Sequence, residues 1–181
     1  HLPSVPQGGD AGMMPSVKTL QFVEQQWVDR VVELAGDTVR TSKVYGRLCR
    51  NNHWTLEKAC PECRQRASDI LQRAQLSNLQ NLASSTDSVK ALELFVRYQM
   101  GRKEGKGWRY QGEGDRSFGL RVIEDLNQLE EWAKQVARES GESDPKATHL
   151  WLIRLYTGFL SRWFVALKGS EEEVEGAEEE Q

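Results

Sequence analysis

The stretch from Ser85 to Lys106 reads STDSVKALELFVRYQMGRKEGK, and it decides the fold class of this chain. Its apolar residues recur at three- and four-residue steps, which is the pattern of a helix with one apolar face. These residues are Val89, Leu92, Phe95, Val96 and Met100. Ser85, Thr86 and Asp87 offer oxygen acceptors for the amides of a first turn. Because Gly101 can end a helix, the stretch predicts one amphipathic helix that leads into a basic, glycine-rich loop.

The same periodicity extends to both sides of this stretch, and no strand-type alternation rises above it. After Gly36, Thr41 and Ser42 can cap a further short helix. The sequence therefore predicts an all-α fold, a bundle of five to six helices with a small zinc knuckle. The longer helices are expected over residues 17–35, 62–83, 118–139 and 146–168.

The composition is that of a folded domain with two unusual ends. Of the 181 residues, 38% are apolar and 28% charged, which suffices for one domain with a core. Seven of the 27 acidic residues fall in the last twelve positions, which leaves 20 acidic residues against 24 basic ones. We therefore expect a Pro- and Gly-rich linker over 1–16, a helical bundle over 17–168 and a disordered acidic tail over 169–181.

The sequence also bears on location and on catalysis. No apolar run is long enough to cross a bilayer, and the first residues lack a basic-then-apolar signal pattern. Three cysteines, an odd number, favour a reducing cytoplasm over a disulfide framework. A phosphate-cradling glycine motif, a nucleophile elbow and a zinc-protease motif are missing. We therefore expect a cytoplasmic binding or scaffold protein that is not an enzyme.

Two groups of basic residues are candidates for RNA binding. The first has four cations spaced three, four and three apart with no acidic residue between them: Arg40, Lys43, Arg47 and Arg50. On a helix this spacing gives one cationic face, which an anionic partner would stabilise; the alternative is a solvated face. The second group lies at the end of the Ser85–Lys106 helix and beyond it, and comprises Arg97, Arg102, Lys103, Lys106 and Arg109.

A segment with cysteine and histidine predicts a structural zinc site. Cys49 and His53 are four residues apart, and Cys60 and Cys63 form a C-x-x-C knuckle. Together they make a closed Cys3His ligand set, which stabilises a fold and leaves no open position for a reactive water. Two alternatives remain open. Cys49 can be a buried hydrophobe beside a surface histidine, or the knuckle can be a redox pair, which the lack of a strand–helix–strand pattern disfavours.

Five segments, in this order, resemble the small helical subunit of type III CRISPR effector complexes. They are FVEQQWVDRVVEL (22–34), RTSKVYGRL (40–48), KALELFVRYQMGRKEG (90–105), GLRVIEDLNQLEEW (119–132) and HLWLIRLYTGFLSRWFVALKG (149–169). That family has a Thr-Ser helix start, a Leu-x-x-x-Tyr-x-x-Gly-Arg type turn and an aromatic-rich last helix. The matching positions here are Thr41 and Ser42, then Arg97 and Tyr98 with Gly101 and Arg102, then Tyr156 to Phe164. The resemblance covers about residues 17–168.

The resemblance implies a non-catalytic subunit of an RNA-guided antiviral defence complex. Such subunits stack head to tail beside other effector subunits, line the path of the guide RNA–target RNA duplex and touch its backbone through Lys and Arg. Carried over to this chain, the candidate contacts are Lys43, Arg47, Arg97, Arg102 and Lys103. The Cys49–Cys63 segment, the long loop after Arg102 and both ends depart from the family pattern. The leader fits a small-subunit domain fused behind another effector subunit.

The alternative function is that of a zinc-stabilised helical adaptor that binds only other proteins. An adaptor would place its partner contacts on apolar helix faces rather than on the cations. A third hypothesis, an enzyme that uses the Cys60 thiol, requires a depressed thiol pKa.

Overall fold

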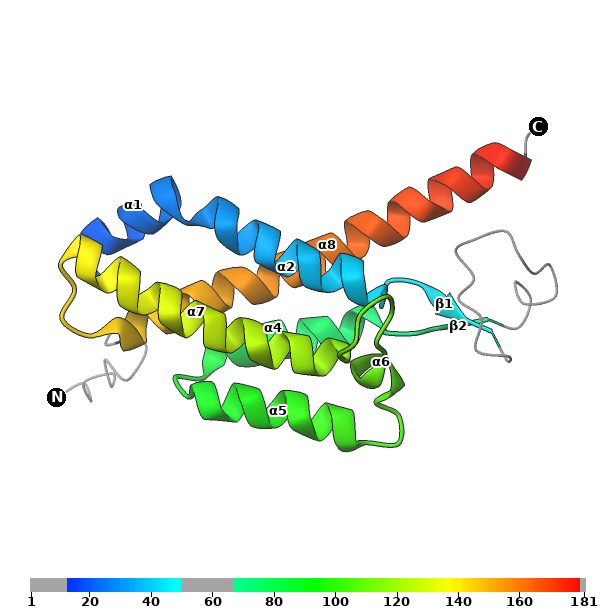
Figure 1. The fold of residues 1–181 in the computed structure, drawn as a ribbon, viewed down its shortest axis with the longest axis horizontal. Helices are drawn as coiled ribbons and strands as arrows, with labels where there is room; N and C mark the ends of the chain where they lie inside the picture. The colour runs from blue at the N-terminus through cyan, green and yellow to red at the C-terminus, as the bar shows by residue number, and fades with distance from the viewer. Residues whose placement is uncertain (1–12, 50–66, 180–181) are drawn as a thin grey trace, which may run out of the picture.

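The computed structural model describes residues 13–49 and 67–179, with side chains as far as Gly169. Within these ranges it is an elongated bundle of helices with a small antiparallel sheet at one end (Figure 1). The elements are α1 Val17–Gln26, α2 Val28–Ser42, β1 Arg47–Leu48, β2 Ser68–Asp69, α4 Arg73–Ser85, α5 Val89–Gly101, α6 Lys106–Arg109, α7 Phe118–Ser140 and α8 Pro145–Glu179. The prediction of an all-α bundle is confirmed. None of the described helices combines the length and the hydropathy that crossing a bilayer requires.

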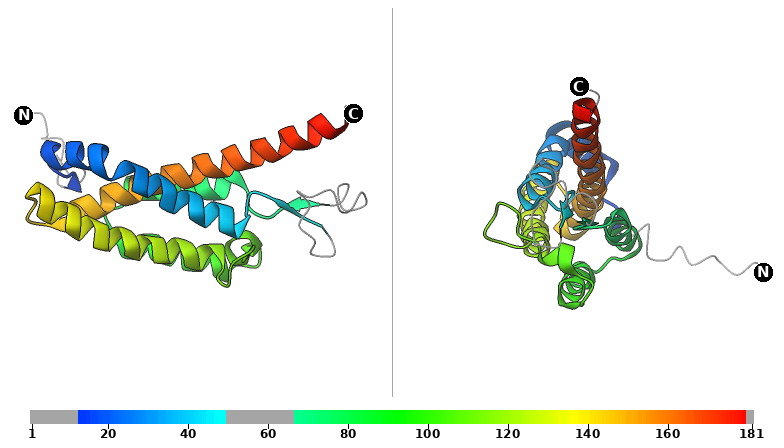
Figure 2. Two further views of the ribbon diagram at one scale, coloured as in Figure 1. Left: turned by 45° about the horizontal axis from the view of Figure 1, so that its top comes forward. Right: turned by 90° about the vertical axis from the view of Figure 1, so that its right-hand side faces the viewer.

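Helix α8 is the central element of the bundle. It packs against α2, α4 and α7, and α7 in turn contacts α5 and α1 (Figure 2). Its buried apolar side chains are Leu150, Leu152, Ile153, Tyr156, Leu160 and Phe164. Because they span a broad face, α8 can bury apolar surface against three neighbours at once.

The first predicted helix differs from the observed one at two points. The helix breaks at Trp27, whose φ and ψ of −125° and −22° depart from helical values. Its side chain is buried against Trp132, with ring centroids 5.7 Å apart. Helix α2 then continues through Gly36, which was expected to end it. A Cβ at Gly36 would lie 2.9 Å from Cε2 of Trp163, so glycine here permits the close approach of α2 and α8.

The chain turns after α2 instead of forming a further helix from Thr41. Lys43 follows α2 in the left-handed conformation, with a φ of 51°. Strand β1 comes next and pairs antiparallel with β2. In this pairing Arg47 lies opposite Asp69, and Leu48 lies opposite Ser68. The two ends of the intervening segment are therefore side by side.

Helix α4 begins at Arg73, later than the predicted start at residue 62. Residues 62–66 lie outside the described part of the chain. The backbone of residues 68 and 69 pairs with β1, and the N–H of Ile70 donates to the carbonyl of Gly46 at 3.1 Å. Since those backbone groups serve the sheet, they are not available for an α-helical ladder.

The Ser85–Lys106 stretch forms α5 as predicted, with a different cap. Leu92 and Val96 are buried on the expected face. The cap is Ser88, whose hydroxyl accepts a hydrogen bond from the N–H of Ala91 at 3.1 Å. Gly101 is the last helical residue. The apolar periodicity therefore predicted the helix. Which of the several Ser, Thr and Asp residues caps it could be seen only in the structure.

The last two helices differ from prediction only at their ends. Helix α7 ends before Gly141, whose φ of 82° is the left-handed conformation typical of a C-terminal cap. Helix α8 continues to Glu179, whereas disorder was expected from residue 169 onward. Glutamate favours helix, and extending an existing helix avoids the cost of nucleation. Figure 1 shows this extension projecting beyond the bundle.

Candidate nucleic-acid interface

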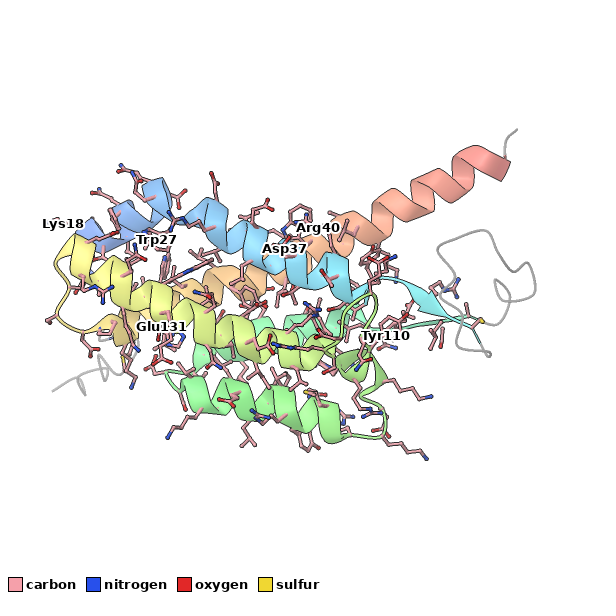
Figure 3. The ribbon with its side chains drawn as sticks, viewed as in Figure 1. Lys18, Trp27, Asp37, Arg40, Tyr110 and Glu131 are labelled. Carbon is pink, nitrogen blue, oxygen red and sulfur yellow. The ribbon has the colours of Figure 1, made fainter. Side chains whose placement is uncertain are left out.

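Arg40, the first predicted RNA contact, lies among acidic and aromatic neighbours. Its guanidinium is 3.2 Å from Oε2 of Glu33, 3.0 Å from Oδ1 of Asp37 and 4.7 Å from the ring centroid of Trp163. Figure 3 shows Arg40 and Asp37 close together on α2. The hydrogen bond to Asp37 is the largest cause that raises the pKa of Arg40 above its ordinary value. Exposed ion pairs of this kind contribute about 1 kcal/mol or less. RNA would therefore compete with weak existing partners at this position.

Lys43 and Arg47 are also paired, and they do not extend the Arg40 face. Nζ of Lys43 is 2.6 Å from Oε1 of Glu113, and Nε of Arg47 is 3.8 Å from Oδ1 of Asp69. The expected single cationic helix face over 40–50 is wrong, because α2 ends at residue 42 and Arg47 belongs to β1. Its premise of missing counter-charges also fails, since the acids come from distant parts of the chain. Arg50 lies outside the described residues.

The second basic group is brought together at one corner of the bundle. We call Arg102, Lys103, Lys106 and Arg109 the α5–α6 corner. All four side chains are exposed, and Glu104 is the acidic residue among them, 3.7 Å from Nε of Arg102. Within the described ranges, Lys103 and Lys106 form no ion pair. Arg97, one turn before the corner, pairs with Glu93 at 2.9 Å.

Arg109 holds the backbone of the corner in place. Its guanidinium NH1 donates to the carbonyl of Met100 at 2.6 Å and to that of Arg102 at 2.5 Å. These are acceptors at the C-terminal end of α5, where carbonyls lack helical partners and cations are favoured. Arg109 therefore has a structural role beside its predicted role in RNA contact.

Buried residues anchor the same corner to the core. Trp108 is fully buried, with its ring centroid 5.3 Å from that of Phe118 and 6.4 Å from that of Phe95. A Cβ at Gly107 would lie 2.3 Å from the carbonyl oxygen of Ile70, so the loop approaches that backbone closely. Trp108 therefore anchors the loop to the core. A rigidly held corner presents its lysines at low entropic cost.

A buried polar cluster, which sequence reasoning missed, lies between α2, α7 and α8. Asp125 of α7 is 8% exposed, and its Oδ2 accepts hydrogen bonds from the hydroxyl of Thr38, at 2.5 Å, and from that of Tyr156. Burial raises the pKa of Asp125 to about 7, and the two hydrogen bonds oppose that shift. Burial likewise raises the pKa of Tyr156 well above 10. Asp125 gives no sequence signal, because it stands in a helix among many exposed acids.

The predicted zinc ligands fall mostly outside the described part of the chain. Cys49 is buried directly after β1, while His53, Cys60 and Cys63 lie outside the described residues. Within residues 13–49 and 67–169, no three metal-ligating side chains come together. Cys49 directly follows Leu48 of β1, which pairs with Ser68 of β2. The donor set suits zinc chemically, so the site stays a prediction.

The geometry therefore gathers four of the nine predicted RNA-binding residues at one corner, pairs four others with acids, and leaves Arg50 undescribed. Comparison with known proteins adds no identification. No family model, no curated protein and no solved structure matches this chain.

Proposed function

We propose that this chain is a non-catalytic, RNA-binding subunit of a larger assembly, of the kind its sequence resembles in type III CRISPR effector complexes. Its role is to contact the backbone of the guide RNA–target RNA duplex through lysine and arginine, while other subunits carry out RNA cleavage. The helical bundle and the order of the five sequence segments support the proposal. The second function considered is a zinc-stabilised adaptor.

The α5–α6 corner carries the proposal. It places four exposed cations next to one acidic residue, two in the turn after α5 and two on α6, where Trp108 packs into the core and Arg109 bonds to the end of α5. Lys103 and Lys106 form no ion pair with any described residue, so RNA phosphates would not have to displace a carboxylate there. Phosphate contacts of this kind give affinity without reading sequence.

The test measures the affinity of the full chain for labelled single-stranded RNA over a range of salt concentrations. In the double variant Lys103→Glu/Lys106→Glu, we expect the affinity at low salt to fall by about tenfold or more. The slope of log affinity against log salt should become shallower by about 0.7 for each lost phosphate contact. Both effects follow from fewer counterions being released.

The matched control is Lys90→Glu, which makes the same charge change in the first turn of α5, at the other end of that helix. It should leave the RNA affinity and the salt slope near those of the parent. An unchanged affinity in the double variant, or an equal loss in Lys90→Glu, would remove the corner from the interface. Repeating the comparison in the natively purified assembly tests whether the same residues act there.

One observation favours the adaptor. Leu94 and Tyr98 lie one turn apart on α5 and are 67% and 63% exposed. Exposed apolar residues in a pair of this kind are common at protein interfaces. If Leu94→Lys abolishes incorporation into the assembly while the corner variant does not affect RNA binding, the adaptor is the better description. The reverse pattern supports the RNA-binding subunit.

A further inference from the structure

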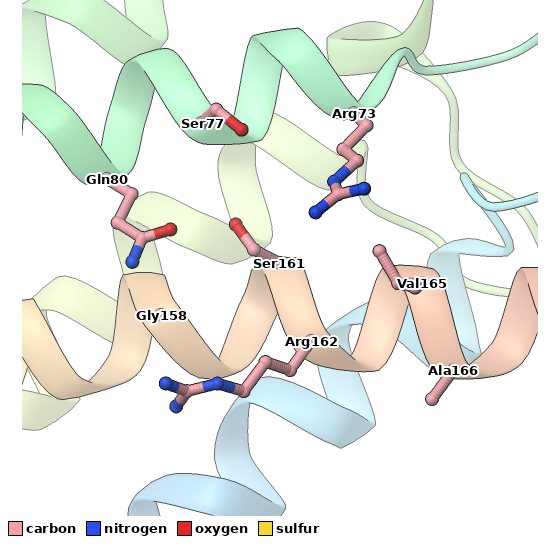
Figure 4. Close-up of a pocket in the computed structure, with 8 residues that line it drawn as sticks. All are labelled: Arg73, Ser77, Gln80, Gly158, Ser161, Arg162, Val165 and Ala166. Atoms are coloured by element: carbon pink, nitrogen blue, oxygen red, sulfur yellow. The ribbon is translucent and has the colours of Figure 1, made fainter.

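A cleft runs between α4 and α8, and none of its lining residues belongs to the α5–α6 corner. Its volume is about 400 Å³, which is within the range of small-ligand sites. Figure 4 shows Arg73, Ser77 and Gln80 on α4 above Gly158 and Ser161 of α8, with the side chain of Arg162 along the opposite edge of α8. Val165 and Ala166 complete the lining. Most of the polar groups that line the cleft can donate hydrogen bonds.

Two of these donors converge over a glycine. A Cβ at Gly158 would lie 3.6 Å from Nε2 of Gln80 and 3.8 Å from the NH1 nitrogen of Arg162. The amide of α4 and the guanidinium of α8 therefore reach the same point from opposite sides. The missing side chain at Gly158 leaves room at that point. A small acceptor group placed there would meet donors from both helices.

The charged residues that line the cleft, Arg73 and Arg162, are both cations. Helix α4 contains no acidic residue, and α8 contains none between Pro145 and Ser170. Two neighbouring cations have partners, since Arg154 pairs with Asp87 at 3.3 Å and Lys168 with Asp69 at 3.2 Å. By contrast, Arg73 and Arg162 form no ion pair with any described residue. The cleft thus holds two cations whose charge the described protein does not neutralise.

The hydroxyl of Ser161 is a further unused group at this site. Its oxygen is buried and has no hydrogen-bond partner among the described residues. Figure 4 shows it directed toward α4, on the side where Ser77 lies. A buried hydroxyl without a partner costs free energy. Rotation about the short serine side chain would let Ser161 donate to a group bound in the cleft.

We propose that the α4–α8 cleft binds a phosphate group. A tetrahedral anion has oxygens that point in several directions, which suits guanidinium, amide and hydroxyl donors from two facing helices. A planar carboxylate would satisfy one arginine and leave the other donors unused. The source of the phosphate is either a free phosphate compound or one phosphate of an RNA backbone. This site is independent of the α5–α6 corner, so either proposal can fail alone.

The test compares the melting temperature of the full chain in phosphate and in chloride of equal ionic strength. A ligand that binds only the folded state raises the melting temperature as its concentration passes the dissociation constant. In Arg73→Gln/Arg162→Gln we expect the saturable part of that rise to vanish, since phosphate as an excluded salt also stabilises folded proteins without saturating. The matched control Arg138→Gln, which removes an exposed arginine of α7 outside the cleft, should keep it. Phosphorus NMR of inorganic phosphate gives a second readout, through line broadening that the double variant abolishes.

A steric variant separates the site from the fold. Gly158→Ala places a methyl group at ordinary contact distance from Gln80 and Arg162, and alanine is the better helix former. We expect Gly158→Ala to retain or raise the melting temperature in chloride, and to weaken phosphate binding severalfold. A loss of fold in this variant would be visible in chloride, so it cannot be mistaken for a loss of binding.

The two sources of phosphate are separated with inorganic phosphate and a short oligouridine. Phosphate binding that the double variant abolishes supports a site for a free phosphate group. Binding of oligouridine alone, again lost in the double variant and retained in Lys103→Glu/Lys106→Glu, supports a backbone site. If neither ligand distinguishes the double variant from the parent, or if succinate binds as well as phosphate does, the proposal is overturned.

Discussion

Because the pKa of the Asp125 carboxyl is raised in the folded protein, we expect the free energy of unfolding to fall as the pH rises from about 4 to about 7. Burial raises its pKa from an ordinary 3.8 to about 7. The folded state therefore holds this proton more tightly than the unfolded state does. The stability from protonated Asp125 is fully present below the unfolded pKa and is lost as the pH rises through the folded pKa. At about 1.4 kcal/mol per pH unit, the total loss is about 4 kcal/mol.

The groups that face Asp125 set the size of this effect. The hydroxyls of Thr38 on α2 and Tyr156 on α8 donate to the carboxylate and lower its pKa. Arg121 on the same helix also lowers it, and Glu124 raises it. Desolvation outweighs all of these. Removing the tyrosine hydroxyl in Tyr156→Phe should therefore raise the pKa further and move the loss of stability to higher pH.

The perturbation is Asp125→Asn, which keeps an oxygen acceptor and cannot ionise. We expect the free energy of unfolding of this variant to rise relative to that of the parent by about 4 kcal/mol between pH 4 and pH 8. Urea titration followed by tryptophan fluorescence at several pH values measures both curves. His149, whose pKa burial lowers, affects stability in the opposite direction. It is present in both proteins and cancels in the difference.

A difference between the two proteins that stays constant over this pH range would refute a raised pKa for Asp125. A parent that gains stability relative to Asp125→Asn as the pH rises would refute it as well. The first result would mean that the carboxyl titrates at an ordinary pKa, and the second that its pKa is lowered in the folded protein. In either case water or a cation would have to reach the carboxyl in the folded protein.

Two further predictions concern the zinc site and the packing of α2 on α8. Elemental analysis of natively purified protein should find one zinc per chain, and Cys60→Ser should lower that ratio and the melting temperature; a zinc-free, unchanged parent would contradict the Cys3His site. Gly36→Ala should destabilise the fold by about 1 kcal/mol, because the added methyl group overlaps Trp163, whose indole N–H donates to the carbonyl of Val32 at 2.9 Å. The control Gly169→Ala, where a Cβ meets nothing within 4 Å, should be neutral or stabilising in the same denaturant titration.

Helices whose faces are regular along the sequence could be predicted closely. Helix α7 was expected over 118–139 and is observed from Phe118 to Ser140, because a long amphipathic repeat needs no distant partner to be recognised. The break at Trp27 could not be predicted in the same way. It depends on Trp132, which lies on another helix, and a single aromatic residue inside an apolar repeat looks like any other core position.

Ion pairs with distant residues could not be predicted from the sequence either. The cations of residues 40–50 were judged by the acids between them, yet Lys43 finds Glu113 and Arg47 finds Asp69. The α5–α6 corner was recognised because its cations follow one another along the chain. The α4–α8 cleft could not be predicted. It depends on how α4 and α8 are aligned side by side, and the sequence alone does not show that alignment.

The short β1–β2 ladder has an entropic consequence for the segment between residues 49 and 67. The pairing of Leu48 with Ser68 closes the chain between them into a loop. The free-energy cost of closing a loop grows only with the logarithm of the loop length. Lengthening or shortening that segment severalfold therefore changes the cost by about 1 kcal/mol, and the bundle can accept either change. A metal that cross-linked the segment would divide one long closure into shorter ones and offset part of that cost. The ladder thus makes this point of the fold one at which a module can be inserted or removed while α2 and α4 keep their places.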